Sequence, residues 1–361
     1  MTKLRLLYLP LEYNVGDQSG PRSAFEELLS HGRLECYIAF PYVCEARQLG
    51  SWEAMLDRLY VAAVEFQPNA IYWHLQTAGI VPTDFIRKVK NLSSKPVICQ
   101  STGDSYWKPP KSIVQLGREI DITFLSGTGM ADAFRKAGCK DVRLLPEPLD
   151  PTRFIKPWMP TNEREFDVVM IANRIWSRNP FRIMDGQKER VKIIRAFEKR
   201  FGKKFGLFGQ GWEKISRCVQ GPIPMSSGIK VLRSSWVSVG TNNWNRIAHY
   251  FSDRQLWSMA SGVPHVCRYI PRLEDFFRDG EHCLFFRTVD EAIKRCEMVL
   301  ENPIEFQNTV GKRGAELVIS RHSAIERMLQ VIESMEELLW CREKGLPLPA
   351  PRYKFLLEKD R

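Results

Sequence analysis

Basic residues crowd one segment of the sequence, Arg174–Lys204. This segment holds eleven lysines and arginines against three acidic residues, in a chain whose formal net charge is +11. Such a surplus attracts anions: a diphosphate, a nucleic acid or an acidic membrane surface. Within it, Trp176, Arg178 and Lys188 combine an aromatic ring with positive charge, which suits an anionic polymer. The alternative is a solvated helix face, above all for Lys192–Lys204.

Two polar side chains in the first half follow predicted strands. Asp104 lies in Gln100–Trp107, among aromatic residues, and a carboxylate there could take the proton from a hydroxyl nucleophile. It is our candidate general base or acceptor-binding group, and an Asx-type turn is the alternative. His74, at the end of Ala70–Trp73, is a second candidate, with a simply packed histidine as its alternative.

The sequence offers no pattern for a metal site or a disulfide framework. The nine cysteines are scattered without a CxxC pair, the six histidines form no HExxH, and no DxD occurs. We therefore expect reduced thiols, no metal and a cytoplasmic protein. No apolar stretch approaches the ~20 residues that span a bilayer, and the N-terminal MTKLRLLYLP indicates a strand rather than an export signal.

Short apolar runs alternate with helical patterns in the first half, which is typical of a parallel sheet wound with helices. The predicted strands are Leu4–Leu9, Tyr37–Phe40, Ala70–Trp73, Pro96–Gln100, Ile122–Leu125 and Arg143–Leu145. The predicted helices are Pro21–Ser30, Trp52–Phe66 and Thr83–Lys90. Five prolines then lie between Pro146 and Pro160, and they indicate a linker because proline resists helices and central strands.

The second half repeats the alternation. Its predicted strands are Phe166–Ala172, Phe205–Phe208, Trp236–Val239 and His265–Arg268, with Cys283–Phe286 as an apolar turn. Its predicted helices are Lys188–Phe201, Asp253–Ala260, Arg272–Arg278, Val289–Leu300, Glu305–Ser320 and Ala324–Lys344. We predict an α/β protein of two Rossmann-like domains facing a cleft, because parallel sheets bind ligands beyond the carboxyl ends of their strands. The expected bounds are 1–150 for the N-terminal domain, 151–165 for a linker, 166–345 for the C-terminal domain and 346–361 for a proline-rich tail.

Several stretches from Leu144 onward are similar to one family of enzymes. They are SDRQLWSMASGVPHV (252–266), PRLEDFFRDGEHCLFF (271–286), ENP (301–303), RHS (321–323), LFGQGW (207–212), LLPEPLDPTRF (144–154) and FDVVMIANR (166–174). In these stretches the chain resembles the group 1 glycosyltransferases of the GT-B fold, particularly the spore-maturation-like branch. The resemblance implies a nucleotide-sugar donor, UDP-type, in the C-terminal domain and an acceptor in the N-terminal domain.

The resemblance also implies which residues bind the donor. A departing nucleoside diphosphate carries negative charge, which side chains must stabilise where no DxD holds a metal. Arg174, at the end of its strand, and Arg254, in SDR, are the main candidates, with Arg182 and Arg190 as secondary ones. Glycines and small residues could let the nucleotide approach the backbone closely, at Gly209 with Gly211 and at Ser261 with Gly262. The alternative is a simple turn for the first pair and a helix C-cap for the second. Gly16 and Gly20, in the loop Glu12–Gly20, resemble the glycine loop that closes over the donor.

One departure from the family concerns the nucleotide ribose. The family commonly has a glutamate where Trp257 stands here, and His249 occupies the place of a more distant glutamate. A tryptophan side chain cannot accept a hydrogen bond from a ribose hydroxyl. The nucleotide is then held differently, Glu274 or Asp275 substitutes, or the site is impaired.

We therefore expect a metal-independent hexosyl- or pentosyltransferase that acts on a hydroxyl acceptor, with retention implied by the resemblance alone. The acceptor stays open. DNA with a hydroxymethylated base, as in phage-type DNA glycosyltransferases, would suit the basic segment, and polysaccharide, protein and small molecules are alternatives. Two further hypotheses are a non-catalytic nucleic-acid- or carbohydrate-binding protein on a decayed transferase scaffold, which Trp257 motivates, and a peripheral membrane transferase without stable insertion.

Overall fold

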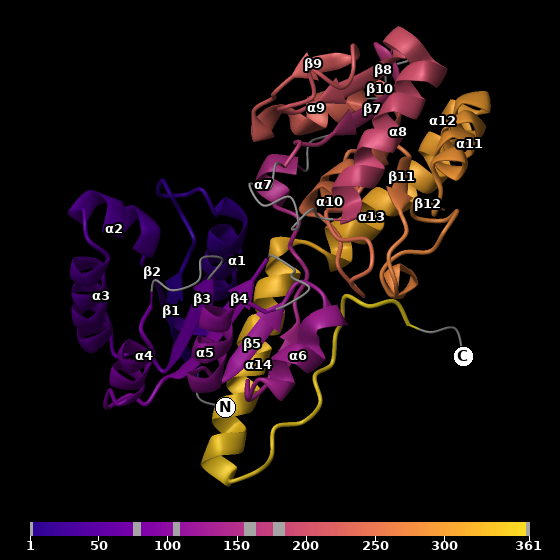
Figure 1. The fold of residues 1–361 in the computed structure, drawn as a ribbon. Helices are drawn as coiled ribbons and strands as arrows, with labels where there is room; N and C mark the ends of the chain where they lie inside the picture. The colour runs from indigo at the N-terminus through magenta and orange to yellow at the C-terminus, as the bar shows by residue number, and fades with distance from the viewer. Residues whose placement is uncertain (1–2, 75–80, 104–108, 155–163, 176–184, 359–361) are drawn as a thin grey trace. The chain divides into compact units, whose positions relative to one another are not determined.

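The computed structural model describes residues 3–74, 81–103, 109–154, 164–175 and 185–358 (Figure 1). The chain forms two compact units. The first consists of Met1–Glu147 and Ala324–Tyr353, and the second of Pro148–Ser323 and Lys354–Arg361. Among the described residues, no helix has both the length and the apolar character needed to cross a bilayer.

The first unit is built on a six-stranded parallel sheet in the order β2-β1-β3-β4-β5-β6. Its strands are β1 (Leu4–Leu9), β2 (Leu34–Ala39), β3 (Ala70–His74), β4 (Val97–Thr102), β5 (Ile122–Leu125) and β6 (Val142–Leu144). Its helices are α1 (Ser19–Ser30), α2 (Tyr42–Leu49), α3 (Trp52–Phe66), α4 (Thr83–Lys90), α5 (Lys111–Glu119), α6 (Ala131–Lys136) and α14 (Ala324–Lys344).

Alternation along the strands gives the first sheet two apolar faces. Leu6 and Tyr8 of β1 pack with α1 and α14 on one face. Leu7 and Leu9 belong to the core that α2, α3 and α4 cover on the other. Successive side chains of a strand point to opposite faces, so a strand that is apolar throughout must be covered on both sides.

The C-terminal helix α14 corrects the predicted domain bounds. The sequence order predicts Ala324–Lys344 as part of the C-terminal domain, whereas this helix belongs to the first unit. Its buried residues Met328, Val331, Ile332 and Met335 join the core beside β1. Arg143 of β6 adds a polar contact, since its Nη1 donates to Ser334 Oγ at 3.2 Å. Sequence order alone gives no sign that the chain returns to the first sheet.

The second unit contains another six-stranded parallel sheet, in the order β12-β11-β10-β7-β8-β9. Its strands are β7 (Phe166–Ile171), β8 (Phe205–Phe208), β9 (Val219–Gly221), β10 (Ser235–Gly240), β11 (His265–Arg268) and β12 (Leu284–Phe286). Its helices are α7 (Pro151–Phe154), α8 (Asp185–Phe201), α9 (Gly228–Arg233), α10 (Asp253–Ala260), α11 (Val289–Glu301), α12 (Pro303–Phe306) and α13 (Lys312–Arg321). The two parallel sheets confirm the prediction of two Rossmann-like α/β domains.

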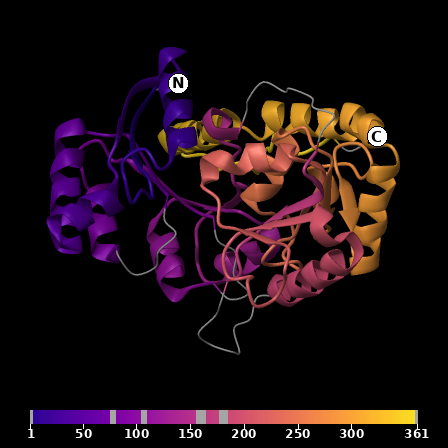
Figure 2. The same ribbon diagram turned by 90° about the horizontal axis from the view of Figure 1, so that it is seen from above.

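One face of the second sheet is covered by α8 and α11, which share a core with β7, β8 and β10 (Figures 1 and 2). Ile193, Ile194 and Phe197 of α8 are fully buried there. Three predicted elements of this unit differ. The expected helix Arg272–Arg278 is only a 3-10 turn at Leu273–Asp275, the turn Cys283–Phe286 contains β12, and the helix Glu305–Ser320 is interrupted by a π-helical segment, Gln307–Gly311.

Candidate functional site

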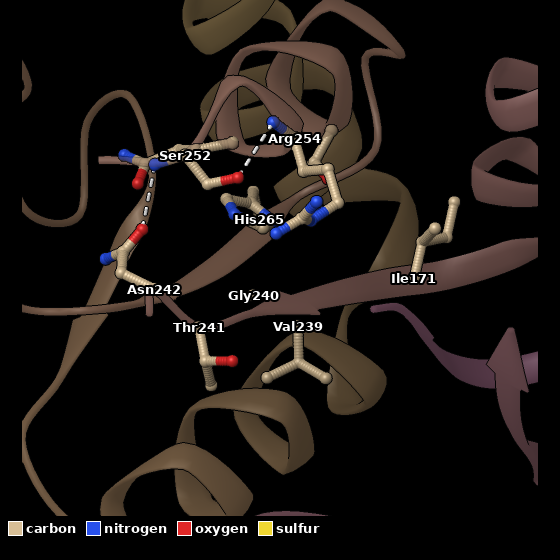
Figure 3. A pocket seen from close by; sticks show the side chains of 10 residues that line it. Ile171, Val239, Gly240, Thr241, Asn242, Ser252, Arg254 and His265 are labelled. Atoms are coloured by element: carbon tan, nitrogen blue, oxygen red, sulfur yellow. Dashed lines mark hydrogen bonds between the residues drawn. The ribbon is translucent and has the colours of Figure 1, made fainter. Parts of the chain in front are cut away.

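A small polar pocket lies at the carboxyl ends of β7 and β10, beside the start of α10 (Figure 3). It is lined by Ile171, Val239, Gly240, Thr241, Asn242, Ser252, Arg254, Gln255, Ser258 and His265. This is where open parallel sheets bind ligands. The cavity has a volume of about 20 Å³, which admits one water-sized group and not a whole nucleotide. A larger ligand would place one polar group in the pocket and extend outward from it.

Arg254 reaches from the first turn of α10 into this pocket (Figure 3). The helix starts at Ser252, whose Oγ accepts from the Arg254 backbone N at 3.4 Å. Ser252 is itself fixed because its backbone N donates to Asn242 Oδ1 at 2.9 Å. The half-buried guanidinium of Arg254 forms no hydrogen bond or ion pair with any described residue. A cation so placed is available for an anion.

Two buried nitrogens in the pocket lack hydrogen-bond partners among the described residues: His265 Nε2 and Gln255 Nε2. The two side chains are only 2% and 4% exposed. His265 is held from its other side, where Nδ1 lies 2.9 Å from Ser238 Oγ. Gly240 makes room for the ring, because a Cβ at position 240 would lie 2.7 Å from His265 Cε1. Unpartnered buried polar atoms are costly, so these two suggest a ligand.

Arg190 of α8 supplies a second cation, which contacts the pocket residue Thr241. It is fully buried on α8 and donates to Thr241 Oγ1 at 2.8 Å and to the Asn173 carbonyl at 2.9 Å. Burial, with a smaller contribution from the charge of Arg254, lowers the pKa of Arg190 to about 9. The guanidinium therefore stays protonated at neutral pH. The complete burial of Arg190 favours a role in positioning the loop after β10 over the direct donor contact that we expected.

Gly186 explains how Arg190 comes so close. A Cβ at position 186 would lie 1.9 Å from the Asn242 carbonyl oxygen, and the Gly186 backbone N donates to the Asn243 carbonyl at 3.0 Å. The first turn of α8 thus rests directly on the loop that follows β10. Only glycine permits this approach.

Arg174 and the glycine turn meet at the neighbouring strand ends, outside the pocket lining. The Arg174 backbone N donates to the Gln210 carbonyl at 2.9 Å, so Arg174 lies beside Gly209 and Gly211. Gly209 has φ +130°, and a Cβ there would lie 2.0 Å from the Ala172 carbonyl oxygen. Gly209 is therefore required for packing against the end of β7, and contact of this turn with the nucleotide stays a prediction. The structure does not bring Arg174 to Arg254 in the lining of one cavity.

Ser261 and Gly262 end α10 and do not line the pocket. The fully buried Ser261 donates through Oγ to the Ser258 carbonyl at 2.6 Å and accepts from the Val263 backbone N at 3.2 Å. Gly262 has φ +78°, as expected of a residue that follows a helix. These contacts are those of the helix-cap alternative, and approach of the donor to this backbone stays a prediction.

Neither Glu274 nor Asp275 lines the pocket. Asp275 Oδ2 lies 2.8 Å from His249 Nε2 and also accepts from Arg272 Nε at 2.8 Å. Burial alone would raise the pKa of Asp275, but the hydrogen bonds from His249 and Arg272 outweigh it, so the pKa is lowered. Glu274 is exposed and accepts from the Tyr269 hydroxyl at 3.0 Å. The structure gives neither carboxylate a place in the pocket.

Trp257 belongs to the apolar core of the second unit. Its ring stacks on Phe154 of α7, with ring centroids 4.4 Å apart and an angle of 12° between the planes. Only 9% of Trp257 is exposed. The position where the family commonly has a ribose-binding glutamate is thus used here for packing.

Three candidate residues of the first unit are described: His74, Gly16 and Gly20. His74 is buried at the end of β3, and burial lowers the pKa of His74 to about 4, so its ring is neutral. Gly16 has φ +90° in the loop before α1, whereas Gly20 lies in the first turn of that helix. Glu12 anchors the loop, since its fully buried carboxylate accepts from Arg22 Nε at 2.7 Å.

Four candidates lie outside the described residues: Asp104, Trp176, Arg178 and Arg182. Lys188 is described and is exposed on α8. No group of three or more His, Cys, Asp or Glu in the described part of the chain could hold a metal ion.

Of the ten residues that line the pocket, only Arg254 was predicted as a site residue; the polar residues that were missed are Thr241, Asn242, Ser252, Gln255, Ser258 and His265. One signal was available, because the polar run Thr241–Asn243 follows the buried strand predicted at Trp236–Val239 after a single glycine. Polar residues that follow a parallel strand indicate the edge of the sheet at which ligands bind. His265 gave no such signal, since a histidine opening a strand looks the same whether it packs or binds.

Comparisons with known proteins agree with this architecture. Residues 188–333 match the family model described as glycosyl transferase-like. HepE from Anabaena, solved with UDP and glucose, is 11% identical with a TM-score of 0.58, over 92% of this chain and 99% of that chain. Sucrose-phosphate synthase from Thermosynechococcus elongatus is 12% identical with a TM-score of 0.62, over 93% and 99%. A glycosyltransferase from Rickettsia africae is 10% identical with a TM-score of 0.58, over 92% and 98%.

No curated protein matches the sequence. At these identities the solved structures show the fold, and the family model shows the kind of domain that the second unit contains. Two parallel Rossmann-like sheets, a glycosyl transferase-like match over the second, and a polar pocket at its strand ends lead to one assignment. The chain has the two-domain fold of the GT-B glycosyltransferases, and its residues 188–333 are similar to the glycosyl transferase-like family.

Proposed function

We propose that the pocket at α10 binds the diphosphate of a UDP-sugar, and that the enzyme transfers the sugar to a hydroxyl acceptor. The observation that carries this proposal is the Arg254 guanidinium, which enters a polar pocket without an acidic partner among the described residues. Arg190 adds a buried positive charge close enough to act on Arg254. Two cations without a carboxylate between them favour a doubly charged ligand.

The chemistry fits the departure of a diphosphate. Negative charge develops on the leaving group during transfer, and preorganised cations and hydrogen-bond donors stabilise it. Arg254 is the cation that can touch the leaving group, and Gln255 Nε2 is a buried donor without a partner in the described structure. Arg190 holds the loop that carries Thr241 and Asn242. With this charge supplied by side chains, we expect transfer to need no metal.

The nucleotide is proposed to be UDP because HepE was solved with UDP. Its ribose must be held without a carboxylate at position 257, since Trp257 stacks on Phe154. For the acceptor hydroxyl we keep Asp104 as the proposed base. His74 fits less well, because it is buried and its pKa is far below neutrality.

Release of UDP from UDP-sugars, measured with an excess of EDTA, tests this proposal. Arg254→Ala should lower turnover about 100-fold, in line with the loss of one donor to a developing charge. Arg313→Ala is the matched control, because Arg313 is exposed on α13. Full turnover by Arg254→Ala, or an equal loss in the control, would remove Arg254 from the donor site. A requirement for added metal would overturn metal-independent transfer.

The acceptor is proposed to be an anionic polymer, and DNA with a hydroxymethylated base is the concrete version. The support is the charge of α8, because five of the nine described basic residues of the segment Arg174–Lys204 are exposed on this helix. Addition of radiolabelled sugar to hydroxymethylated and to plain DNA of one sequence tests it. Transfer to neither DNA, alongside active hydrolysis of the donor, would exclude DNA while leaving the donor site intact.

A further inference from the structure

The solvent-facing side of α8 carries a line of positive charges. Lys188, Lys192, Arg195 and Lys199 are all exposed, and they follow one another at intervals of four, three and four residues. Such intervals place side chains on one face of a helix. Lys203, in the 3-10 turn that follows, extends the same line. We call these five residues the α8 basic stripe.

No described residue neutralises the α8 basic stripe, since none of its five members forms an ion pair with the described part of the chain. The two glutamates of α8 with described side chains are engaged elsewhere. Glu189 accepts from Arg268 Nε at 2.7 Å, and Glu198 accepts from the Arg217 backbone N at 3.0 Å. Exposed helices usually mix charges of both signs, so five uncompensated cations in line need another explanation than solubility.

A membrane does not fit this stripe well. A helix that lies in a bilayer surface inserts an apolar face between the lipids. The apolar face of α8, formed by Ile193, Ile194 and Phe197, is already buried against the second sheet. The exposed side of the described α8 residues contains no large apolar side chain. The stripe offers charge alone, along a single line.

A linear polyanion complements such a line. The residues from Lys188 to Lys199 extend over about 16 Å at 1.5 Å per residue. Duplex DNA carries one negative charge for every ~1.7 Å of its axis, so several phosphates can face the stripe at once. We infer that the α8 basic stripe docks the phosphate backbone of double-stranded DNA.

The docking surface deepens the proposed acceptor and depends on that proposal for its biological meaning. The stripe starts at Lys188, two residues from Arg190, so one end of it lies at the end of α8 that supports the donor pocket. DNA bound along α8 would therefore reach the same end of the second unit as the nucleotide-sugar. Binding to the stripe needs no donor, so it can be tested apart from transfer.

The experiment measures binding of a 20-base-pair duplex by fluorescence anisotropy between 50 and 200 mM salt, without nucleotide. One variant replaces Lys192, Arg195, Lys199 and Lys203 by Gln. The control replaces four exposed basic residues elsewhere, Lys230, Lys312, Arg313 and Lys344, and so removes the same charge. Because each phosphate contact contributes about 0.9 to the slope of log K against log salt, the stripe variant should lose a slope of about 3 to 4. The control should keep the wild-type slope.

Two results would overturn the inference. One is an equal loss of DNA binding in both variants, which would mean that binding depends on the net charge of the protein and not on the position of the charges. The other is stripe-dependent binding to phosphatidylserine vesicles in the absence of binding to duplex DNA. The shift of the melting temperature on addition of UDP, measured on the same variants, reports the donor site separately. Loss of DNA binding by the stripe variant, with an intact UDP response, supports the inference. A missing UDP response in wild type counts against the donor proposal only.

Discussion

Arg190 Nε donates to Thr241 Oγ1 across 2.8 Å, and this hydrogen bond ties α8 to the loop that follows β10. Both residues are buried, Arg190 completely. The same guanidinium donates to the Asn173 carbonyl after β7. One cation thus joins the two strand ends that border the proposed donor pocket and brings its charge close to Arg254.

Replacement of Arg190 by Met should therefore affect both folding and binding. The buried acceptors at Thr241 and Asn173 lose their donor, which should lower the free energy of unfolding by about 1–3 kcal/mol. The affinity for UDP should fall about tenfold as the second charge is removed. Arg190→Lys keeps the charge but not the planar set of donors, so its stability and its UDP affinity should lie between those of wild type and Arg190→Met. Urea unfolding and titration with UDP measure the two effects. Unchanged stability together with unchanged affinity would refute the role of Arg190.

Gly209 should tolerate no side chain. Alanine there would adopt an unfavourable backbone conformation, φ +130°, and would place its Cβ 2.0 Å from the Ala172 carbonyl oxygen. Gly221 is the matched control, because it has φ +91° but no atom within 4 Å of the point that an added Cβ would occupy. Both alanine variants share the backbone penalty, and Gly209→Ala should lose about 1–3 kcal/mol more because of the collision. Equal melting temperatures would show that the turn can shift.

Acid should destabilise the second unit through His265. Burial lowers the pKa of His265 to about 3, whereas an unfolded histidine has a pKa near 6.5. Below pH 6.5 the unfolded chain therefore binds a proton that the folded chain does not, so this stability is complete above pH 6.5 and is lost as the pH falls toward 3. The loss is up to ~1.4 kcal/mol per pH unit.

His265→Gln removes this titration. Between pH 6.5 and 4.5, wild type should lose more stability than the variant, measured as the difference of their free energies of unfolding at each pH. His74 also has a lowered pKa and contributes to the pH dependence of stability. Both chains contain His74, so its contribution cancels in the difference. Parallel stability curves would mean that His265 is protonated in the folded state.

A glutamate at position 257 should not restore a family-like donor site. Trp257 is 9% exposed and stacked on Phe154, so Trp257→Glu buries a carboxylate in an apolar contact and leaves a gap. The melting temperature should fall strongly and the affinity for UDP should not rise. Trp257→Phe, which keeps an aromatic ring, is the control and should cost much less. A gain in UDP affinity with Glu would show that the position still faces the donor.

The sequence predicts most of the fold because both sheets are made of short, continuously apolar strands. Leu4–Leu9, Ile122–Leu125, Phe205–Phe208 and His265–Arg268 appear in the structure with the predicted bounds. The location of α14 could not be predicted, because an amphipathic helix shows that it packs but not on which sheet. The π-helical segment at Gln307–Gly311 was hidden for a similar reason, since it keeps a helical pattern of burial.

The candidate site was predicted only in part. Arg254 was found through the SDR stretch that resembles the family, and the structure places it in the pocket. Arg190 was predicted as a positively charged candidate, but its burial was not. This burial depends on the contact of Gly186 with the loop after β10, and the sequence does not reveal such a tertiary contact. Ser261 caps α10, and the sequence could not separate this role from a ligand turn because the two share the same small residues.

The central claim is that Arg254 binds the diphosphate of the donor. Calorimetric titration of UDP into wild type, Arg254→Ala and Arg313→Ala tests it most directly. The account predicts binding by wild type and the Arg313 control, at least tenfold weaker binding by Arg254→Ala, and equal melting temperatures without ligand, because the Arg254 guanidinium bonds to no described residue. Equal UDP affinity in wild type and Arg254→Ala, or no binding of UDP to wild type, would contradict it.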